Sequence, residues 1–291
     1  MKIVVCVKQV PATGEQRLDP VTGTVIREGV ASILNPFDAY ALEEAVRLKE
    51  RLGGEITALS MGVPSAQETL RRALAVGADR AVLLSGRAFA GADTLATARA
   101  LALAIRKLGG ADLVLCGRMA TDGDTAQVGP MLAEMLGIPH AADVSRVERV
   151  EDGRVTLERM SDDGYRAERL PLPSLLTVVK EINVPRLPSV TGVLRAARAE
   201  VMVWDAVDVG ASPEDIGQRG SRTRVVRTSR PAKKAGCRML GGFAALMEAL
   251  TQYRVDLVDP NGAFRSVPVQ PWLFELLAKH TLEIQEKEKE E

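Results

Sequence analysis

A glycine- and aspartate-rich stretch, residues 117–130 (GRMATDGDTAQVGP), constrains the fold of this chain more than any other segment. It follows the apolar run 112–116 (DLVLC), which is typical of a buried parallel strand. It leads into residues 131–136 (MLAEML), which predict a helix that ends at Gly137. The stretch is therefore a loop between the carboxyl end of a strand and the start of a helix, which is where open α/β sheets bind ligands.

The composition of this loop favours a ligand that carries phosphate. Glycine lets a backbone approach a ligand closely, and the free N–H groups at the start of a helix bind anions. The loop is not a Walker A motif, because no Gly-Lys-Ser/Thr follows, and it is not G-x-G-x-x-G. Taken alone, it is compatible with a nucleotide loop and equally with an ordinary capped turn.

The rest of the first half of the chain alternates strand-like and helix-like segments. Apolar runs at 2–7, 55–60 and 81–84 predict strands. The predicted helices run from Asn35-Pro36 to Gly53-Gly54, from a Ser65–Glu68 capping box to Val76, and from an Asp93 cap to Leu108. This alternation predicts an α/β fold with a mostly parallel sheet and helices on both faces.

With these elements in place, the chain resembles the β subunit of electron-transfer flavoproteins. The resemblance runs in register from Met1 to about Lys234 and rests on segments 4–11 (VVCVKQVP), 34–38 (LNPFD), 41–45 (ALEEA), 77–81 (GADRA) and 122–130 (DGDTAQVGP). It implies a Rossmann-like nucleotide-binding fold and a heterodimer with an α subunit that carries the electron-transferring FAD. The β subunit of this family binds an adenine nucleotide of its own, which is AMP in conventional members and a second FAD in electron-bifurcating members, including those tied to nitrogen fixation.

Matched motif by motif, the resemblance implies a nucleotide site made of strand ends, one helix start and the glycine-rich loop. Its members are Cys6, Asn35, Pro36, Phe37, Asp38, Met61, Gly117, Arg118, Met119, Ala120, Thr121, Asp122, Gly123, Asp124, Thr125, Ala126, Gln127 and Val128. We expect Met61 to pack on a ring, and Thr125 and Gln127 to hold phosphate or ribose oxygens. We expect Asp122 and Asp124 to accept from hydroxyl groups or to cap the helix, because a carboxylate beside phosphate is repulsive.

Two local differences within the resemblance predict FAD as the cofactor, with AMP as the alternative. Gly123 and Ala126 remove side-chain bulk where a dinucleotide must pass, and Gly123 permits backbone geometries closed to other residues. Asp38 stands where conventional members often have Cys. In the bifurcating type, NADH delivers a hydride to the β-subunit flavin. One electron then goes to ferredoxin or flavodoxin and the other, through the α-subunit FAD, to a quinone oxidoreductase or an acyl-CoA dehydrogenase.

An alternative function of a different class is that of a regulatory or structural module that binds AMP and takes no part in electron transfer. Neither His140 nor His280 joins a catalytic set, and the three cysteines show no metal-ligand spacing. We therefore expect no catalytic residue and no metal site. That expectation suits an electron carrier, whose cofactor supplies the redox chemistry while the protein positions and tunes it.

The chain changes character after the α/β part. Residues 147–170 predict a hairpin, and 183–190 form a proline-punctuated loop before a short basic helix. By resemblance this region recognises redox partners, with Val190 as the apolar anchor and Leu187 or Leu194 as alternatives. We assign residues 1–200 to the α/β nucleotide-binding domain, 201–240 to an extended arm that wraps the α subunit, and 241–291 to a helical extension of unknown role.

The overall composition narrows the partners and the compartment. The 46% of apolar residues suffices for a core, and the formal charge of zero gives no pull toward nucleic acid or anionic membrane. We therefore expect no nucleic-acid partner, although residues 219–234 are basic. The chain begins directly with a strand-like run and contains no apolar stretch of about 20 residues, so we expect no signal peptide, no membrane insertion and a cytoplasmic location.

Overall fold

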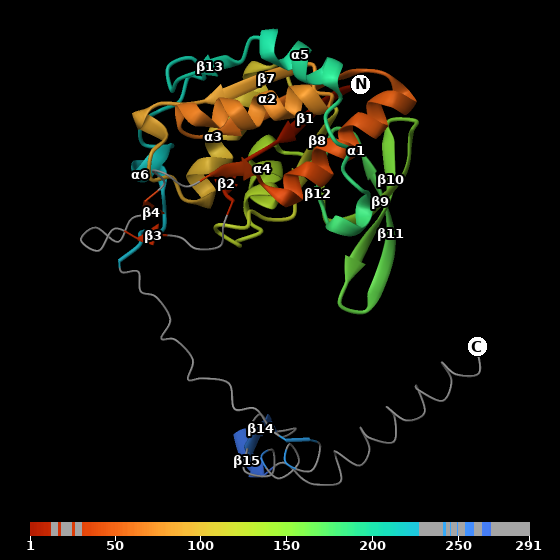
Figure 1. Cartoon of the computed structure of the whole chain (residues 1–291), viewed down its shortest axis with the longest axis vertical. Helices are drawn as coiled ribbons and strands as arrows, with labels where there is room; N and C mark the ends of the chain where they lie inside the picture. The colour runs from red at the N-terminus through yellow and green to blue at the C-terminus, as the bar shows by residue number, and fades with distance from the viewer. Residues whose placement is uncertain are drawn as a thin grey trace. The chain divides into compact units, whose positions relative to one another are not determined.

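A nine-stranded sheet is the centre of the first part of the chain in the computed structural model (Figure 1). Its strands are β1 (Lys2–Cys6), β6 (Glu55–Met61), β7 (Arg80–Leu84), β8 (Leu113–Gly117), β9 (His140–Glu151), β10 (Arg154–Ser161), β11 (Gly164–Pro171), β12 (Ser174–Val178) and β13 (Met202–Trp204). Their order is β11-β10-β9-β12-β8-β1-β6-β7-β13, and every pair from β9 to β13 is parallel. Only β10 pairs antiparallel, with β9 and β11. The predicted mostly parallel α/β fold is confirmed.

The structure describes residues 1–12, 17–18, 25–26, 31–226, 241–242, 245, 249, 254–258 and 264–268. The chain divides into two units, Met1–Ser229 and Arg230–Glu291. In the second unit, β14 (Arg254–Val258) pairs antiparallel with β15 (Phe264–Pro268), so a hairpin lies within the extension that we expected to be helical. The charged end of the chain, residues 283–291, lies outside the described residues.

Helices cover both faces of the sheet. They are α1 (Pro36–Leu52), α2 (Gln67–Val76), α3 (Thr94–Lys107), α4 (Val128–Leu136), α5 (Val190–Arg198) and α6 (Gly217–Gly220), with short 3-10 turns η1 (Pro64–Ala66), η2 (Arg87–Phe89) and η3 (Lys180–Ile182). One apolar core joins α1, α2 and α5 to the sheet through residues such as Leu42 and Leu70. A second core joins α3 and α4 to the opposite face through residues such as Leu101 and Leu132. None of the helices in the described part of the chain has the length and apolar character needed to span a bilayer.

The order of the strands reverses at β1. The chain passes from β1 to β6 and β7 on one side, and then crosses to β8 and β12 on the other side. Cys6 is in register with Leu59 on β6 and with Cys116 on β8. Such a reversal opens a crevice at the carboxyl ends of the two diverging strands, and ligands of open α/β sheets bind there. The fold therefore directs attention to the ends of β1 and β8.

Several predicted helix ends agree with the structure and one does not. Pro36 occupies the first turn of α1, Gly53 follows its last residue, and the Asp93 side chain accepts a hydrogen bond from Ala96 N at 2.9 Å as the N-cap of α3. The predicted Ser65–Glu68 capping box is wrong. The turn η1 continues directly into α2, so no extended cap residue separates them, and Ser65 Oγ instead contacts Gln9 Oε1 at 3.1 Å.

The regions after α4 differ from the predicted boundaries in two respects. The hairpin predicted over residues 147–170 is present, but β9 already begins at His140, before the predicted start. The resulting β9–β11 ribbon extends the sheet and projects from the body (Figure 1). Residues 201–220, which we assigned to the arm, contribute β13 and α6, and Val209 and Ile216 are buried in the second core.

The described arm begins at a cluster of hydrogen bonds around Asp93. Its Oδ2 accepts bonds from Arg222 N at 2.7 Å, Thr223 N at 2.9 Å and Thr223 Oγ1 at 3.1 Å, while Asp93 N donates to Ser221 Oγ at 2.8 Å. Partial burial acts to raise the pKa of Asp93, but these hydrogen bonds and that from Ala96 lower the pKa to about 2. A charged Asp93 therefore caps α3 and fixes residues 221–223 at the same time.

We predict that Asp93→Ala loosens the start of the arm and weakens α3. Loss of an N-cap costs about 1–2 kcal/mol of unfolding free energy, which urea titration of the purified chain measures. Trypsin should also cleave after Arg222 faster than in the unchanged protein. Asp215→Ala is the matched control, because Asp215 is exposed and makes one long ion pair, 3.6 Å, with Arg99. Equal behaviour of the two variants would refute this role of Asp93.

Candidate nucleotide-binding site

Three strand ends bring distant predicted site residues to one edge of the sheet. Cys6 ends β1, Met61 ends β6 and Gly117 ends β8, and these three strands are adjacent. Cys6 and Met61 are partly buried, whereas the Cα partner of Cys6 on β8, Cys116, is buried. A hydrogen bond with Cys6 and burial both raise the pKa of the Cys116 thiol, so Cys116 stays protonated and inert. The edge thus offers backbone and apolar surface rather than a reactive group.

Asn35 joins the start of α1 to the glycine-rich loop. It is 1% exposed, its Nδ2 donates to Met119 O at 2.9 Å, and its Oδ1 accepts from Thr121 N at 3.2 Å. It occupies the predicted N-cap position, but its side chain makes no capping bond to α1. The oxygen and the nitrogen of the side-chain amide both bind the loop, so Asn35 joins the loop to the start of α1.

Asp38, in the first turn of α1, ties the ends of β1 and β8 together. Its Oδ2 accepts from Lys8 N at 2.7 Å, and the Asn35 side chain and the main-chain N–H of Gly117 also donate to the carboxyl group. Burial raises the pKa of Asp38 to about 7, and these hydrogen bonds and the Lys8 charge only partly offset burial. A Cβ on Gly117 would lie 2.5 Å from Asp38 Oδ1 and 2.6 Å from the carbonyl carbon of Phe37, so only glycine allows this approach.

Lys8 is a site residue that the sequence prediction missed. Its Nζ lies 2.6 Å from Asp122 Oδ1, with the Lys8 side chain 45% and the Asp122 side chain 16% exposed. This ion pair joins the segment after β1 to the glycine-rich loop. The available signal was position, because Lys8 directly follows the predicted strand 2–7 and lies two residues beyond the end of β1. Arg118, by contrast, forms an ion pair with Asp143 on β9 at 3.1 Å.

The glycine-rich loop turns at residues other than its glycine. Asp124 and Ala126 have φ of 49° and 53°, whereas Gly123 is absent from the positive-φ positions of the described chain. The expectation that Gly123 supplies a special backbone geometry is therefore wrong. A Cβ at Gly123 would meet no heavy atom within 4 Å, so this residue faces open space, and residues 123–127 are all exposed.

The loop ends at an uncapped helix. Gln127 is the N-cap residue of α4 and makes no capping bond, since its Oε1 accepts from Thr94 Oγ1 at 3.0 Å. The expectation that Asp122 or Asp124 caps this helix is therefore wrong. Within the described residues, nothing accepts a hydrogen bond from the main-chain N–H groups of Val128 and Gly129. Such groups at a helix start bind phosphate oxygens.

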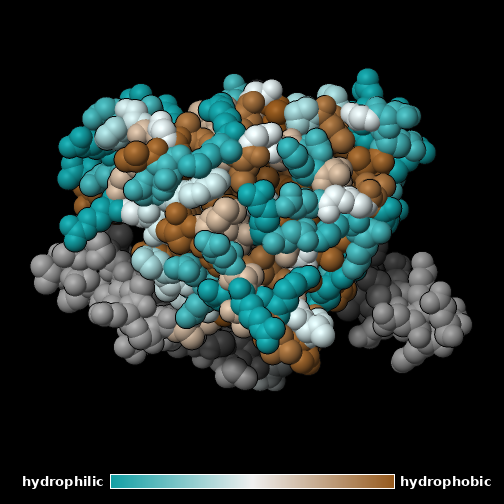
Figure 2. Space-filling view, turned by 90° about the horizontal axis from the view of Figure 1, so that it is seen from above, coloured by the Kyte–Doolittle hydropathy of each residue, from teal (hydrophilic) through white to brown (hydrophobic). Residues whose placement is uncertain are grey.

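Two of the three predicted partner-recognition residues, Leu187 and Val190, lie in a separate segment that we call the apolar loop (residues 183–190). Leu187 is 84% and Val190 78% exposed, and Leu194, on the adjoining helix α5, is 57% exposed. Val190 ends this loop and is also the first residue of α5, which Ser189 caps by accepting a bond from Gly192 N at 3.0 Å. Figure 2 views the molecule from above, the side on which α5 lies in Figure 1, and shows apolar side chains set among polar ones.

Comparison with known proteins gives a consistent result. A family model for the electron transfer flavoprotein domain matches residues 22–209. The electron transfer flavoprotein subunit beta of Thermoanaerobacterium thermosaccharolyticum is 50% identical over 254 residues, which cover 87% of this chain and 97% of that protein. The caffeyl-CoA reductase-Etf complex subunit CarD of Acetobacterium woodii is 49% identical over 83% of this chain and 92% of its own length. Protein FixA of Azorhizobium caulinodans is 49% identical over 81% and 86%, respectively.

We predict that alanine lowers the stability of the fold at one glycine of this site and leaves it nearly unchanged at another. Gly117→Ala forces a Cβ into Asp38 and Phe37, and overpacking of this kind costs about 1–3 kcal/mol of unfolding free energy. Gly123→Ala meets nothing and should change that free energy by less than about 0.5 kcal/mol. Urea titration of the two variants tests this, and a Gly117→Ala variant as stable as Gly123→Ala would disprove the close approach.

The raised pKa of Asp38 predicts a specific pH dependence. The pKa of Asp38 in the folded chain, about 7, lies above its value in the unfolded chain, so the folded chain binds the carboxyl proton more tightly. The stability that the protonated Asp38 contributes is therefore lost as the pH rises toward 7. Asp38→Asn lacks this titration. The unfolding free energy of the unchanged protein minus that of Asp38→Asn should therefore fall by roughly 2 kcal/mol between pH 5 and pH 8. A difference that stays constant over this range would contradict the assignment.

Proposed function

The chain belongs to the electron transfer flavoprotein family as a β subunit, and we propose that it holds FAD in the crevice between β1 and β8 and passes electrons within a heterodimer. Membership of this family implies an α-subunit partner. The identity of the nucleotide, the residues that hold it and the redox partners make up the proposal, and the donor groups at the start of α4 support it most directly.

The donor set of the crevice suits the phosphates of an adenine nucleotide. The N–H groups of Val128 and Gly129 at the start of α4 lack partners in the described chain, and the exposed residues 123–127 lead into them. Thr125 and Gln127 add a hydroxyl and an amide at the same place. The helix start also carries partial positive charge, which favours an anionic ligand. This set is the single observation on which the proposed nucleotide site rests.

The loop also favours a dinucleotide over AMP. Gly123 faces open space, and Ala126, three residues later, carries only a methyl group, so neither side chain would obstruct the second half of a dinucleotide. When bound there, a flavin would supply hydride acceptance and one-electron transfer. The chain's own residues would bind and orient it. NADH as donor and ferredoxin or flavodoxin as low-potential acceptor complete the proposal.

The apolar loop is the proposed docking surface for a redox partner. Val184, Leu187 and Val190 are each more than three-quarters exposed, and side chains of this kind in one group mark interaction surfaces. Arg195 and Arg198 on α5 add positive charge beside them, which favours a partner with an apolar recess and an acidic rim. A dehydrogenase or a quinone oxidoreductase is the proposed class of partner. The arm that begins at residues 221–223, where Asp93 holds it, is the proposed contact with the α subunit.

The nucleotide content of the heterodimer tests the proposal. Co-expressed with its α subunit and denatured after mild purification, each heterodimer should release two FAD and no stoichiometric AMP. The double variant Thr125→Ala with Gln127→Ala should retain FAD about tenfold to a hundredfold more weakly, because two hydrogen bonds of about 0.5–1.5 kcal/mol each are lost.

Thr94→Val is the matched control, since it removes only the bond from Thr94 to Gln127 and leaves both loop side chains in place. This control should retain FAD nearly as the unchanged protein does. One FAD and one AMP per heterodimer would show that the β subunit binds AMP as in conventional members. Unchanged retention in the double variant would move the nucleotide away from this loop.

A further inference from the structure

The apolar loop exposes large side chains without main-chain support. Within the described chain, no hydrogen bond joins the backbone of residues 183–188 to another backbone group, and Pro185 and Pro188 lack an N–H group. Neither helix nor strand forms before α5 begins at Val190. A segment of this kind is normally mobile, because no regular structure restricts its dihedral angles. Its position must therefore come from its side chains.

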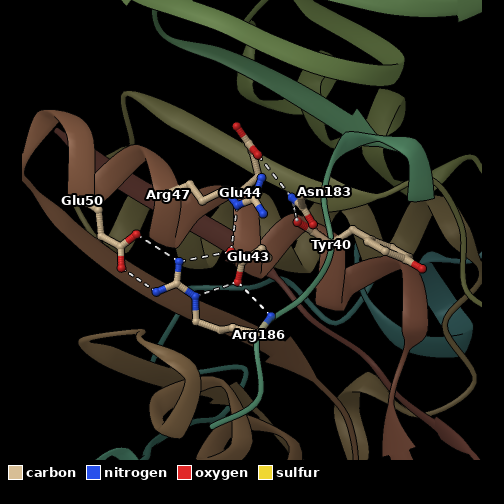
Figure 3. Close-up of polar contacts among 7 residues, drawn as sticks. All are labelled: Tyr40, Glu43, Glu44, Arg47, Glu50, Asn183 and Arg186. Atoms are coloured by element: carbon tan, nitrogen blue, oxygen red, sulfur yellow. Dashed lines mark hydrogen bonds and ion pairs between the residues drawn. The ribbon is translucent and has the colours of Figure 1, made fainter. Parts of the chain in front are cut away.

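Arg186 fixes the centre of the apolar loop to helix α1 (Figure 3). Its main-chain N donates to Glu43 Oε2 at 3.1 Å, and its Nε donates to the same oxygen at 2.8 Å. Its Nη2 reaches Glu43 Oε1 at 3.1 Å and Glu50 Oε2 at 3.0 Å, while Nη1 reaches Glu50 Oε1 at 2.5 Å. One planar guanidinium thus binds two carboxylates in the two-point manner that arginine favours.

Asn183 provides a second tie at the start of the loop (Figure 3). It is buried, and its Nδ2 donates to Tyr40 O at 3.1 Å and to Glu44 Oε2 at 3.2 Å. Both acceptors belong to α1, as do Glu43 and Glu50. The loop is therefore held at two points along one helix.

The charges of the Arg186 contact are stable at neutral pH. Burial acts to raise the pKa of Glu43, but the contacts with Arg186 and Arg47 outweigh burial and lower the pKa. The hydrogen bond with Arg186 likewise lowers the pKa of Glu50. The contacts with Glu50 and Glu43 in turn raise the pKa of Arg186. The Glu43 side chain is 3% exposed, and a buried charge requires a partner. Loss of Arg186 would leave Glu43 with Arg47 alone.

We propose that Arg186 is a positioning residue that holds the apolar loop in one orientation on α1 and so sets the place of a docked redox partner relative to the nucleotide crevice. The inference rests on the docking role proposed above. Helix α1 links the two places, because Asp38 lies in its first turn and Glu43 and Glu50 follow about 8 and 18 Å along its axis at 1.5 Å per residue. A fixed loop removes the ordering cost from the docking step.

A distance measurement between two nitroxide labels tests the clamp directly. Ketone-bearing amino acids at Leu187 and at Glu134, an exposed position on α4, accept the labels and leave the native cysteines in place. In the heterodimer with its α subunit, the unchanged protein should give one narrow distance distribution. Arg186→Gln should at least double its width, and Arg186→Lys should give an intermediate width, because lysine lacks the planar fork.

The matched control is Arg149→Gln, which removes an exposed ion pair with Glu151 at 3.3 Å and should leave the distribution narrow. A pH titration adds a second readout. Because the pKa values of Glu43 and Glu50 are lowered, the narrow distribution should persist down to about pH 4, near the ordinary glutamate pKa, and broaden only below it. An unchanged width in Arg186→Gln overturns the proposed clamp.

Kinetics then separate the clamp from the docking role. With ferredoxin, flavodoxin and an acyl-CoA dehydrogenase tried as acceptors, Arg186→Gln should raise KM for the accepted protein about tenfold and leave kcat and the reduction of dichlorophenolindophenol unchanged. Val190→Asp, at an exposed position that carries no label, should raise KM while the label distribution stays narrow. If Val190→Asp leaves KM unchanged, docking at this loop fails, and the label result alone decides the clamp. If only Val190→Asp raises KM, Arg186 does not position the loop for docking.

Discussion

The buried carboxyl group of Asp38 is the contact on which the crevice depends. Main-chain N–H groups at the ends of β1 and β8 both donate to it, so one side chain of α1 fixes where two diverging strands end. The arrangement requires glycine at position 117, because any Cβ there would overlap Asp38 and Phe37. Asn35, one turn earlier, then holds the glycine-rich loop over the same edge. Helix start, strand ends and loop are thus a single hydrogen-bonded unit.

Helix α1 carries this unit at one end and the apolar loop along its length. Asp38 faces the strand ends, whereas Glu43 and Glu50 bind Arg186 of the apolar loop. A packed helix is stiff, so α1 is suited to hold the strand ends and the apolar loop at a constant separation. In an electron carrier this matters, because transfer between cofactors depends on how closely they approach. In the proposed function, the fold supplies positioning and the proposed flavin would supply the redox chemistry.

The sequence predicted the elements of this structure better than the contacts between them. Apolar runs, together with the glycine and aspartate residues at their ends, predicted the strands and helices. The family resemblance grouped Cys6, Met61 and Gly117, which the structure places at the ends of three adjacent strands. The use of each polar side chain depended on its spatial neighbours. Asn35 and Ser65 occupy sequence positions typical of helix caps, but their side chains bind the loop and Gln9 instead. Arg186 and Glu43 lie 143 residues apart, and local sequence carries no signal for such a pair.

The central claim is that the adenine nucleotide lies between the ends of β1 and β8. Photolabelling of the purified heterodimer with an 8-azidoadenine form of FAD tests it directly, because the reactive group marks the segments next to the adenine ring. The account predicts labelled peptides of this chain that contain residues 6–8, 35–38 or 117–128, with the labelling suppressed by excess FAD. Suppressible labelling confined to other segments of this chain would contradict it.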